Sequence, residues 1–321
     1  MIMEILISDT HYGVKQNSIT WLNSQLDFIY KQLIPFCREQ NEKSSIYHLG
    51  DVFDSRSSIN PFVASRVRKA FKDLYKVSKE MIILGGNHDY YSPNEDSIDS
   101  INMVLHEDDE FKPTVVTKDI YLKGQDLFIP WYRFNDVEDI KRYIEDYNVS
   151  RVFVHADITM LDDEHKRLFK GLQVFSGHIH TPKHYKNLHT LGSTYALTFA
   201  DSNDDRGFYV LQEEWLRFVP NEYTIRFHRL YNDEIFNDVS FSKVDYIELY
   251  VDQLNLLNER YTSRIKELTN KYHNINIIPK STISDDKEFE KIDLYNIEEL
   301  CKQCIPDELK EKFLMISQDE Q

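Results

Sequence analysis

Short apolar runs alternate with longer amphipathic segments through the first part of the chain. The runs at 3–8, 46–49 and 81–84 are rich in isoleucine and leucine, which predicts buried strands. Hydrophobic residues spaced by threes and fours from Ile19 to Arg38 predict a helix, and a second predicted helix runs from Pro61 to Lys79, with proline at a favoured first position. Strands and helices in strict alternation indicate parallel strands joined by right-handed crossovers, so we expect an α/β fold.

The pattern continues beyond the third strand but becomes less regular. From Pro182 to Pro220 the hydrophobic period changes to two, with turn residues at Gly192 and near Asp204, which predicts an antiparallel meander that completes a second sheet. Between these regions we expect helices at Asp96–Leu105 and Asp136–Tyr147, and strands near Val115 and at Leu127–Trp131, Val152–His155 and Leu172–Ser176.

The character of the chain changes again after Pro220. Predicted strands at 224–230, 244–251 and 275–278 surround a predicted helix at 255–272, which describes a small α/β module. From Ser281 to Gln321 the chain holds 12 acidic residues against 5 lysines, with helical spacing of its apolar residues broken at Pro306. Such short helices cannot bury an apolar face alone, so they either dock on the body or bind a partner. We therefore expect three parts, at 1–220, 221–280 and 281–321.

Composition narrows the class of protein. A chain of 321 residues with 41% hydrophobic residues has room for one large core and a smaller module. It has no apolar run of the ~20 residues that a membrane span requires, and it begins with a strand rather than a signal peptide, so we expect a cytoplasmic protein without a membrane partner. The three cysteines are too few for a disulfide framework. Cys301 and Cys304 form an isolated C-x-x-C pair, which we interpret as incidental helix positions rather than a metal or redox site.

The net charge of −16 argues against a protein that grips nucleic acid on its own. If the substrate is DNA, bound cations and a partner must supply much of the electrostatic attraction.

Polar residues with metal-binding chemistry follow the apolar runs. The carboxyl ends of parallel strands meet at one edge of a sheet, so these residues should converge there. Carboxylate, amide and imidazole groups together suit transition metals, and we place Asp51 between two ions. Each motif taken alone has an ordinary alternative, such as a helix cap or a turn, but all five in one chain favour a metal site. The motifs are Asp9-x-His11, Gly50-Asp51-x-x-Asp54, Gly86-Asn87-His88-Asp89, His155 and Gly177-His178-x-His180.

In this order the five motifs resemble the calcineurin-like metallophosphoesterase superfamily, and the resemblance covers roughly the first 215 residues. It implies a two-sheet α/β/β/α sandwich, here followed by a small α/β capping domain and C-terminal helices. It also implies two divalent cations per chain, for which we expect Mn²⁺. The resemblance implies that the first ion is bound by Asp9, His11, Asp51 and His180, and the second by Asp51, Asn87, His155 and His178.

Four further residues receive expected roles. By the same resemblance, His88 protonates the leaving oxygen and Asp54 holds His88 in the productive tautomer. Arg56 could contact the phosphate bidentately. Of the histidines outside the motifs, which we interpret as core or surface residues, His184 is the best candidate for a substrate contact.

Other segments are similar to the SbcD-type nucleases of this superfamily, including those of T-even-like phages. These segments are Gly50–Arg56, Leu191–Phe199 and Asp204–Phe208. The resemblance implies a DNA exonuclease and endonuclease subunit for recombination, repair and replication, with an SMC-like ABC ATPase as partner. We expect it to form a homodimer. The alternatives are a phosphoesterase for nucleotides, cyclic nucleotides or phosphoproteins, and a metal-bound scaffold without catalysis.

Overall fold

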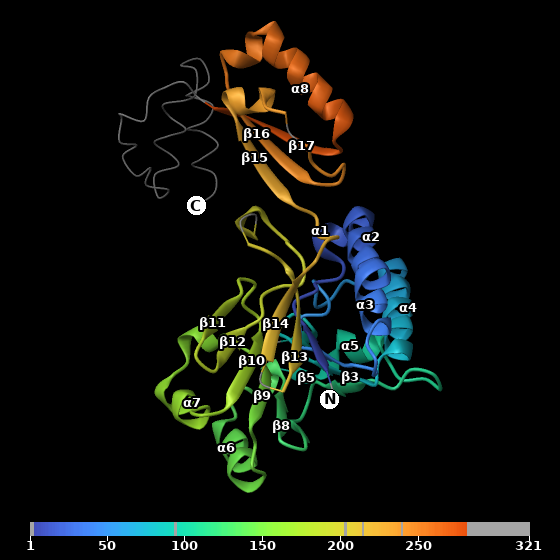
Figure 1. The fold of residues 1–321 in the computed structure, drawn as a ribbon, viewed down its shortest axis with the longest axis vertical. Helices are drawn as coiled ribbons and strands as arrows, with labels where there is room; N and C mark the ends of the chain where they lie inside the picture. Colours follow the sequence, from blue (N-terminus) through green and yellow to red (C-terminus); the bar gives the residue numbers. More distant parts are fainter. Residues whose placement is uncertain (1–2, 93–94, 202–203, 214, 239, 281–321) are drawn as a thin grey trace, which may run out of the picture.

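The computed structural model describes residues 3–92, 95–201, 204–213, 215–238 and 240–280. Two six-stranded sheets lie face to face in the body of the molecule (Figure 1). The first has the order β14-β13-β1-β2-β3-β6, and the second has the order β11-β12-β10-β9-β8-β7. The first sheet consists of β1 (Glu4–Ile7), β2 (Ser45–His48), β3 (Glu80–Leu84), β6 (Thr114–Val116), β13 (Gly207–Gln212) and β14 (Trp215–Pro220). The second consists of β7 (Tyr121–Lys123), β8 (Asp126–Ile129), β9 (Arg151–His155), β10 (Gln173–Gly177), β11 (Lys183–Tyr185) and β12 (Leu188–Thr190).

Each sheet has a parallel centre and antiparallel edges. β1, β2, β3 and β6 run parallel, as do β12, β10, β9 and β8. β13, β14, β7 and β11 are antiparallel to their neighbours. The parallel centres therefore bring their carboxyl ends to one rim of the sandwich.

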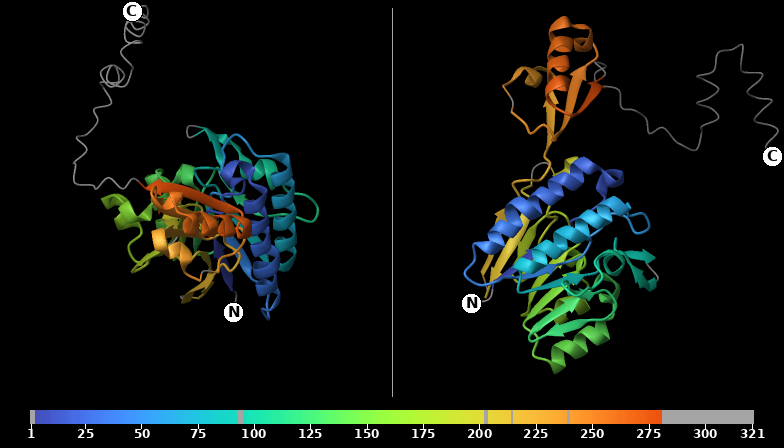
Figure 2. Two further views of the ribbon diagram at one scale, coloured as in Figure 1. Left: turned by 90° about the horizontal axis from the view of Figure 1, so that it is seen from above. Right: turned by 90° about the vertical axis from the view of Figure 1, so that its right-hand side faces the viewer.

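Helices cover the outer face of each sheet, which gives the predicted α/β/β/α sandwich (Figure 2). On the first sheet these are α2 (Ile19–Asp27), α3 (Ile34–Arg38) and α4 (Pro61–Val77); on the second, α6 (Val137–Asp146) and α7 (Asp163–Leu168). The smaller elements are α1 (Val14–Asn17), which is a left-handed turn, α5 (Ser100–Val104), and the hairpin of β4 (Tyr90–Ser92) and β5 (Glu95–Asp99). Single 3₁₀ turns occur at Trp131–Arg133, Ile158–Met160, Phe199–Asp201, Asn232–Phe236 and Asn255–Leu257.

Alternation along the strands divides the core into layers. In β1, Ile5 and Ile7 pack toward the helices, whereas Leu6 faces the other sheet. Aromatic rings fill the space between the sheets, where Phe153 stacks on Phe128 and Phe175 with ring centroids 4.8 and 5.2 Å apart. Both faces of each sheet are thus buried, which is why the central strands are apolar throughout.

The predicted helix from Ile19 to Arg38 contains a π-helical segment at Phe28–Leu33 between α2 and α3. Pro35 has no N–H to donate to the carbonyl four residues before it. Next to it, the N–H of Ile34 donates to the carbonyl of Ile29, five residues back, as in a π-helix. The helix continues through this widened turn.

A small module follows the body. Its parallel sheet has the order β15-β16-β17, with β15 (Phe227–Tyr231), β16 (Tyr246–Asp252) and β17 (Asn274–Lys280), and α8 (Glu259–Lys271) covers one face. The module joins the body through the chain after β14 (Figure 1). Ile225 and Phe227 belong to the core of the body, and Trp21 Nε1 donates a hydrogen bond to the Tyr246 hydroxyl at 3.2 Å.

Two predictions of secondary structure were wrong. Residues 95–99 form β5 rather than the start of a helix, because Asp99 accepts the N–H of Asn102 at 2.7 Å and caps α5, so that this helix begins only at Ser100. The region 182–220 is not one meander. Its first hairpin belongs to the second sheet, whereas β13 and β14 extend the first sheet beside β1. No helix among the described residues is both long enough and apolar enough to cross a bilayer.

Candidate metal centre

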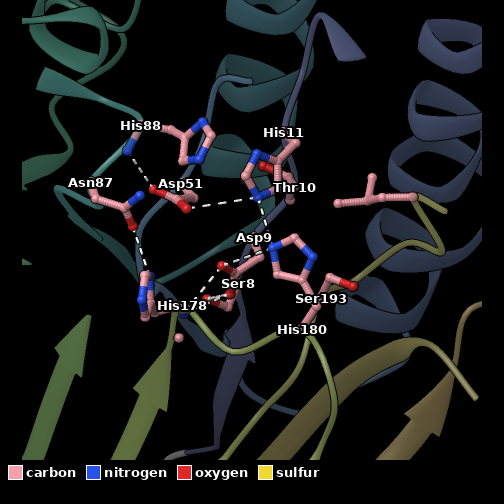
Figure 3. A network of polar contacts seen from close by, with 12 residues as sticks. Ser8, Asp9, Thr10, His11, Asp51, Asn87, His88, His178, His180 and Ser193 are labelled. Atoms are coloured by element: carbon pink, nitrogen blue, oxygen red, sulfur yellow. Dashed lines mark hydrogen bonds and ion pairs between the residues drawn. The ribbon is translucent and has the colours of Figure 1, made fainter. Parts of the chain in front are cut away.

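The predicted ligand residues come from five different strands and meet at the rim of the sandwich. Asp9 and His11 follow β1, Asp51 follows β2 and Asn87 follows β3. His155 is the last residue of β9, and His178 and His180 follow β10. Figure 3 shows Asp9, His11, Asp51, Asn87, His178 and His180 pointing toward one another.

The backbone is constrained where it presents these side chains. Asp9, His11, Asp51 and His178 have φ angles of 50°, 46°, 54° and 83°, in the left-handed region that residues other than glycine seldom adopt. Hydrogen bonds between the loop after β1 and the loop after β2 hold this conformation at Asp9, His11 and Asp51. The Asp9 N–H donates to the Gly50 carbonyl at 3.0 Å, and the His11 N–H donates to the Asp51 carbonyl at 3.1 Å. Strain of this kind clusters at functional sites, because it fixes side chains before a ligand arrives.

One group of candidate ligands consists of Asp9, His11 and His180. The Nε2 atoms of His11 and His180 lie 3.1 Å apart, and His180 Nε2 lies 3.8 Å from Asp9 Oδ1. Atoms that bind one divalent ion at about 2.1 Å are separated by roughly 3 Å or slightly more, so this spacing suits a shared cation.

A second group consists of Asp51, His155 and His178, together with the amide oxygen of Asn87. Asn87 Oδ1 lies 3.1 Å from His155 Nε2 and 2.8 Å from His178 Nδ1. His155 Nδ1 lies 2.6 Å from the Leu49 carbonyl oxygen, which can only accept a hydrogen bond. Nδ1 therefore donates, which leaves Nε2 free to bind a metal with the other ligands of this group.

Asp51 lies between the two groups and is 2% exposed. Its Oδ2 is 3.7 Å from His11 Nε2 in the first group, and its Oδ1 is 3.4 Å from His155 Nε2 in the second. The His88 N–H also donates to Oδ1 at 2.9 Å, which fixes the carboxylate. Each oxygen of this one carboxylate thus faces a different group of ligands, and the donor set fits two divalent transition metals.

Burial and charge perturb these groups strongly. Burial lowers the pKa of His11 to about 3 and raises that of Asp9. Burial opposes the charge of His155 too, but the Asp51 carboxylate outweighs it and raises the pKa of His155 to about 9. The imidazoles of His155 and His11 in turn outweigh the burial of Asp51 and hold its pKa well below the usual range. The centre therefore keeps a buried carboxylate ionised, as a cation site requires.

Of the residues predicted to act on the substrate, His88 borders the centre. Its ring lies edge-on to His11 with centroids 4.9 Å apart. Its Nδ1 is 2.7 Å from the backbone carbonyl of Asp54, while the Asp54 carboxylate lies 3.6 Å from His11 Nδ1. The contact that orients His88 thus uses the main chain of Asp54, and the side chain of Asp54 stands beside a candidate ligand.

The other two predicted substrate contacts lie away from the ligands. Arg56 lines a groove of about 540 Å³ beside α4 and the β4–β5 hairpin. His184 is in β11, where its Nδ1 lies 3.2 Å from His189 Nδ1 and its Nε2 3.1 Å from the Tyr209 hydroxyl. Neither residue is among the candidate metal ligands of the described chain.

The sequence analysis assigned no role to two residues that support the site. Asp89 is fully buried and accepts the N–H groups of Gly86 at 2.9 Å and Phe53 at 3.1 Å, so it ties the loop of Asn87 to the loop of Asp51. Ser8 donates from Oγ to Asp9 Oδ2 at 2.5 Å. Their only sequence signal is position, since each is adjacent to a motif residue or belongs to the motif itself.

A model of the calcineurin-like phosphoesterase family matches residues 5–233. Exonuclease subunit 1 of Enterobacteria phage T4 is 27% identical over 325 residues, covering 94% of this chain and 92% of that protein. The crystal structure of Pseudomonas putida nuclease MPE is 17% identical, with 58% of this chain and 66% of that chain covered and a TM-score of 0.31.

Proposed function

Because the chain belongs to the calcineurin-like phosphoesterase family, we propose that it is a metal-dependent DNA exonuclease and endonuclease subunit that hydrolyses phosphodiester bonds at DNA ends. The observation that carries the proposal is the position of Asp51, with one carboxylate oxygen toward each of two ligand groups. The relative from phage T4, which aligns over nearly the whole chain, is named as an exonuclease subunit.

We propose that two Mn²⁺ ions occupy the centre. Asp9, His11, Asp51 and His180 would hold the first, and Asp51, Asn87, His155 and His178 the second. When bound, the ions would act as Lewis acids and offset the negative charge of the phosphodiester.

His88 is assigned the role of proton donor to the leaving oxygen. The Asp54 carbonyl accepts from Nδ1, so only the doubly protonated ring has a second N–H, on Nε2, to give to the substrate. Asp54 is proposed to hold His88 in the productive tautomer through its main-chain carbonyl. Arg56 and His184 remain proposed contacts with the DNA.

The segment 281–321, which lies outside the described residues, is proposed to dock an SMC-like ABC ATPase, and the module at 221–280 to cap the substrate. A partner with a basic surface would compensate for the net charge of −16. Deletion of the chain after Pro279 should abolish co-purification with the proposed SMC-like ABC ATPase and leave weak Mn²⁺-dependent cleavage of single-stranded DNA. Unchanged co-purification would contradict the docking role.

We further propose a homodimer through the apolar groove beside Arg56. Tyr91 and Met103, which are 57% and 70% exposed, line this groove together with Ile59, Ile98 and Val104. A contiguous apolar surface of this kind is typical of an interaction site. Met103→Glu should give monomers in analytical ultracentrifugation. The matched control is Met160→Glu, at a position 83% exposed in a different part of the body, which should leave the association state unchanged.

The direct test of the activity compares substrates. With Mn²⁺, the wild-type protein should cleave single-stranded DNA faster than bis-p-nitrophenyl phosphate or a cyclic nucleotide. Asp51→Asn and His178→Asn should lose this activity while keeping the circular dichroism spectrum of the wild type. A preference for the small substrates, or full activity in either variant, would overturn the assignment.

A further inference from the structure

The main-chain carbonyl of His180 is held by two donors from distant parts of the chain. The Ser193 N–H donates to it at 3.0 Å, and Arg206 donates to it from Nη1. Gly192 permits this close approach: its φ is 76°, and a Cβ there would lie 2.8 Å from the same oxygen. The side chain of His180 is itself 35% exposed, so the surrounding core restrains its position only in part.

Arg206 is a buried cation with fixed partners. It is 2% exposed, and its Nη2 lies 2.8 Å from Asp201 Oδ1 and 3.4 Å from Asp204 Oδ2. A buried guanidinium is tolerated only when it is paired, and its planar fork binds two acceptors in one geometry. Asp201 is restrained as well, because its other oxygen accepts the Leu197 N–H at 2.8 Å. The guanidinium therefore places the His180 carbonyl relative to a rigid turn.

The same network supports Asp9. The Asn221 N–H donates to the Arg206 carbonyl at 2.6 Å, and Asn221 Nδ2 donates to the Thr194 carbonyl at 3.0 Å. The Thr194 N–H donates to the carbonyl of Ser8, which precedes Asp9, at 3.0 Å. Two members of the first ligand group thus rest on one set of hydrogen bonds, and none of these bonds reaches Asn87 or His155.

We propose that Arg206 is a positioning residue for the first cation of the centre, acting through the backbone of His180. This rests on the proposed function, since it presupposes that Asp9, His11, Asp51 and His180 bind an ion. A residue that matters only for folding would affect stability without favouring one ion over the other.

The test is isothermal titration of the metal-free, full-length protein with Mn²⁺. In Arg206→Met one of the two ions should bind at least about tenfold more weakly, as is typical when the support of a metal ligand is removed, and the other should bind as in the wild type. The matched control is Arg151→Met. Arg151 pairs with Asp126 at 2.6 Å and Glu4 at 3.0 Å at the amino ends of their strands, so its loss should lower stability without changing either Mn²⁺ affinity.

The outcomes separate the two proposals. If the wild-type protein binds two Mn²⁺ ions and Arg206→Met binds both with unchanged affinity, the positioning role alone is overturned. A wild-type protein that binds no Mn²⁺ would overturn the proposed function and this inference together. If Arg206→Met lacks a folded circular dichroism spectrum, the same titration is made with Arg206→Lys. Lysine keeps the positive charge beside Asp201 but cannot reach the His180 carbonyl at the same time. Weaker binding of one ion would then support the positioning role, and unchanged affinities for both ions would overturn it.

Discussion

Replacing His88 by glutamine should slow DNA cleavage strongly and leave metal binding intact. The Asp54 carbonyl, 2.7 Å from Nδ1, keeps a proton on that nitrogen, so the imidazolium has its remaining N–H on Nε2. A glutamine side chain can occupy a similar position but cannot release a proton near neutral pH.

The size of the effect follows from the step that is lost. Removal of a general acid lowers a rate by about 10²–10⁴-fold, equivalent to roughly 3–5 kcal/mol of activation free energy. That loss applies only where the leaving oxygen needs a proton. An alkoxide leaving from DNA needs one, whereas p-nitrophenolate is stable as an anion.

The assay therefore measures turnover of single-stranded DNA and of bis-p-nitrophenyl phosphate at the same Mn²⁺ concentration. His88→Gln should lose its activity mainly on DNA and retain most of it on the nitrophenyl ester. His106→Gln is the matched control, since this exposed histidine has no role in the proposed site and its Nδ1 lies 3.3 Å from the Met103 carbonyl, and it should not change the ratio of the two activities.

Two results would refute the reasoning. Equal losses on both substrates would show that His88 does not serve as the acid for the leaving group. Loss of one bound Mn²⁺ per chain would show that His88 is a ligand, a role open to it because its ring nitrogen lies within 4.8 Å of ligand atoms of His11 and Asp51.

Three further predictions concern other parts of the body. Gly86→Ala should abolish binding of at least one Mn²⁺ by calorimetry, because its Cβ would collide with the Asp51 backbone and carboxylate; wild-type affinity would contradict the described packing. Phe153→Ala should lower the free energy of unfolding by about 3–5 kcal/mol in urea, because the buried ring stacks between two others; a loss below about 1 kcal/mol would be inconsistent with this core. Burial raises the pKa of the Cys37 thiol to about 12, so with the other two cysteines replaced by serine the folded protein should react with Ellman's reagent at pH 8 only slowly, and faster as the pH rises; rapid reaction at pH 8 would disprove the burial.

The strands and the candidate site were predictable from sequence because one constraint governs both. A parallel strand buried on both faces is apolar throughout, so β1, β2 and β3 are recognisable as short hydrophobic runs. Their carboxyl ends necessarily share a rim, so polar residues directly after them converge. His155 was identified in the same way, as the single polar residue that ends a β-branched run.

Local patterns failed where the outcome depends on distant pairing. Ile98, Ile101 and Leu105 have helical spacing, yet Asp99 pairs with Tyr90 in a hairpin and the helix begins only after it. The continuous apolar run of β13 predicts a strand but not its neighbour, and the neighbour is β1 from the other end of the body. No pattern in the sequence signals the contact between Arg206 and the His180 carbonyl, so only the structure reveals it.

The measurement that tests the two-ion centre most directly is anomalous X-ray diffraction from crystals grown with Mn²⁺. We predict two manganese peaks, one contacting Asp9, His11 and His180 and the other contacting Asn87, His155 and His178, with the Asp51 carboxylate bound to both. A single peak, or two peaks that do not share Asp51, would contradict the account.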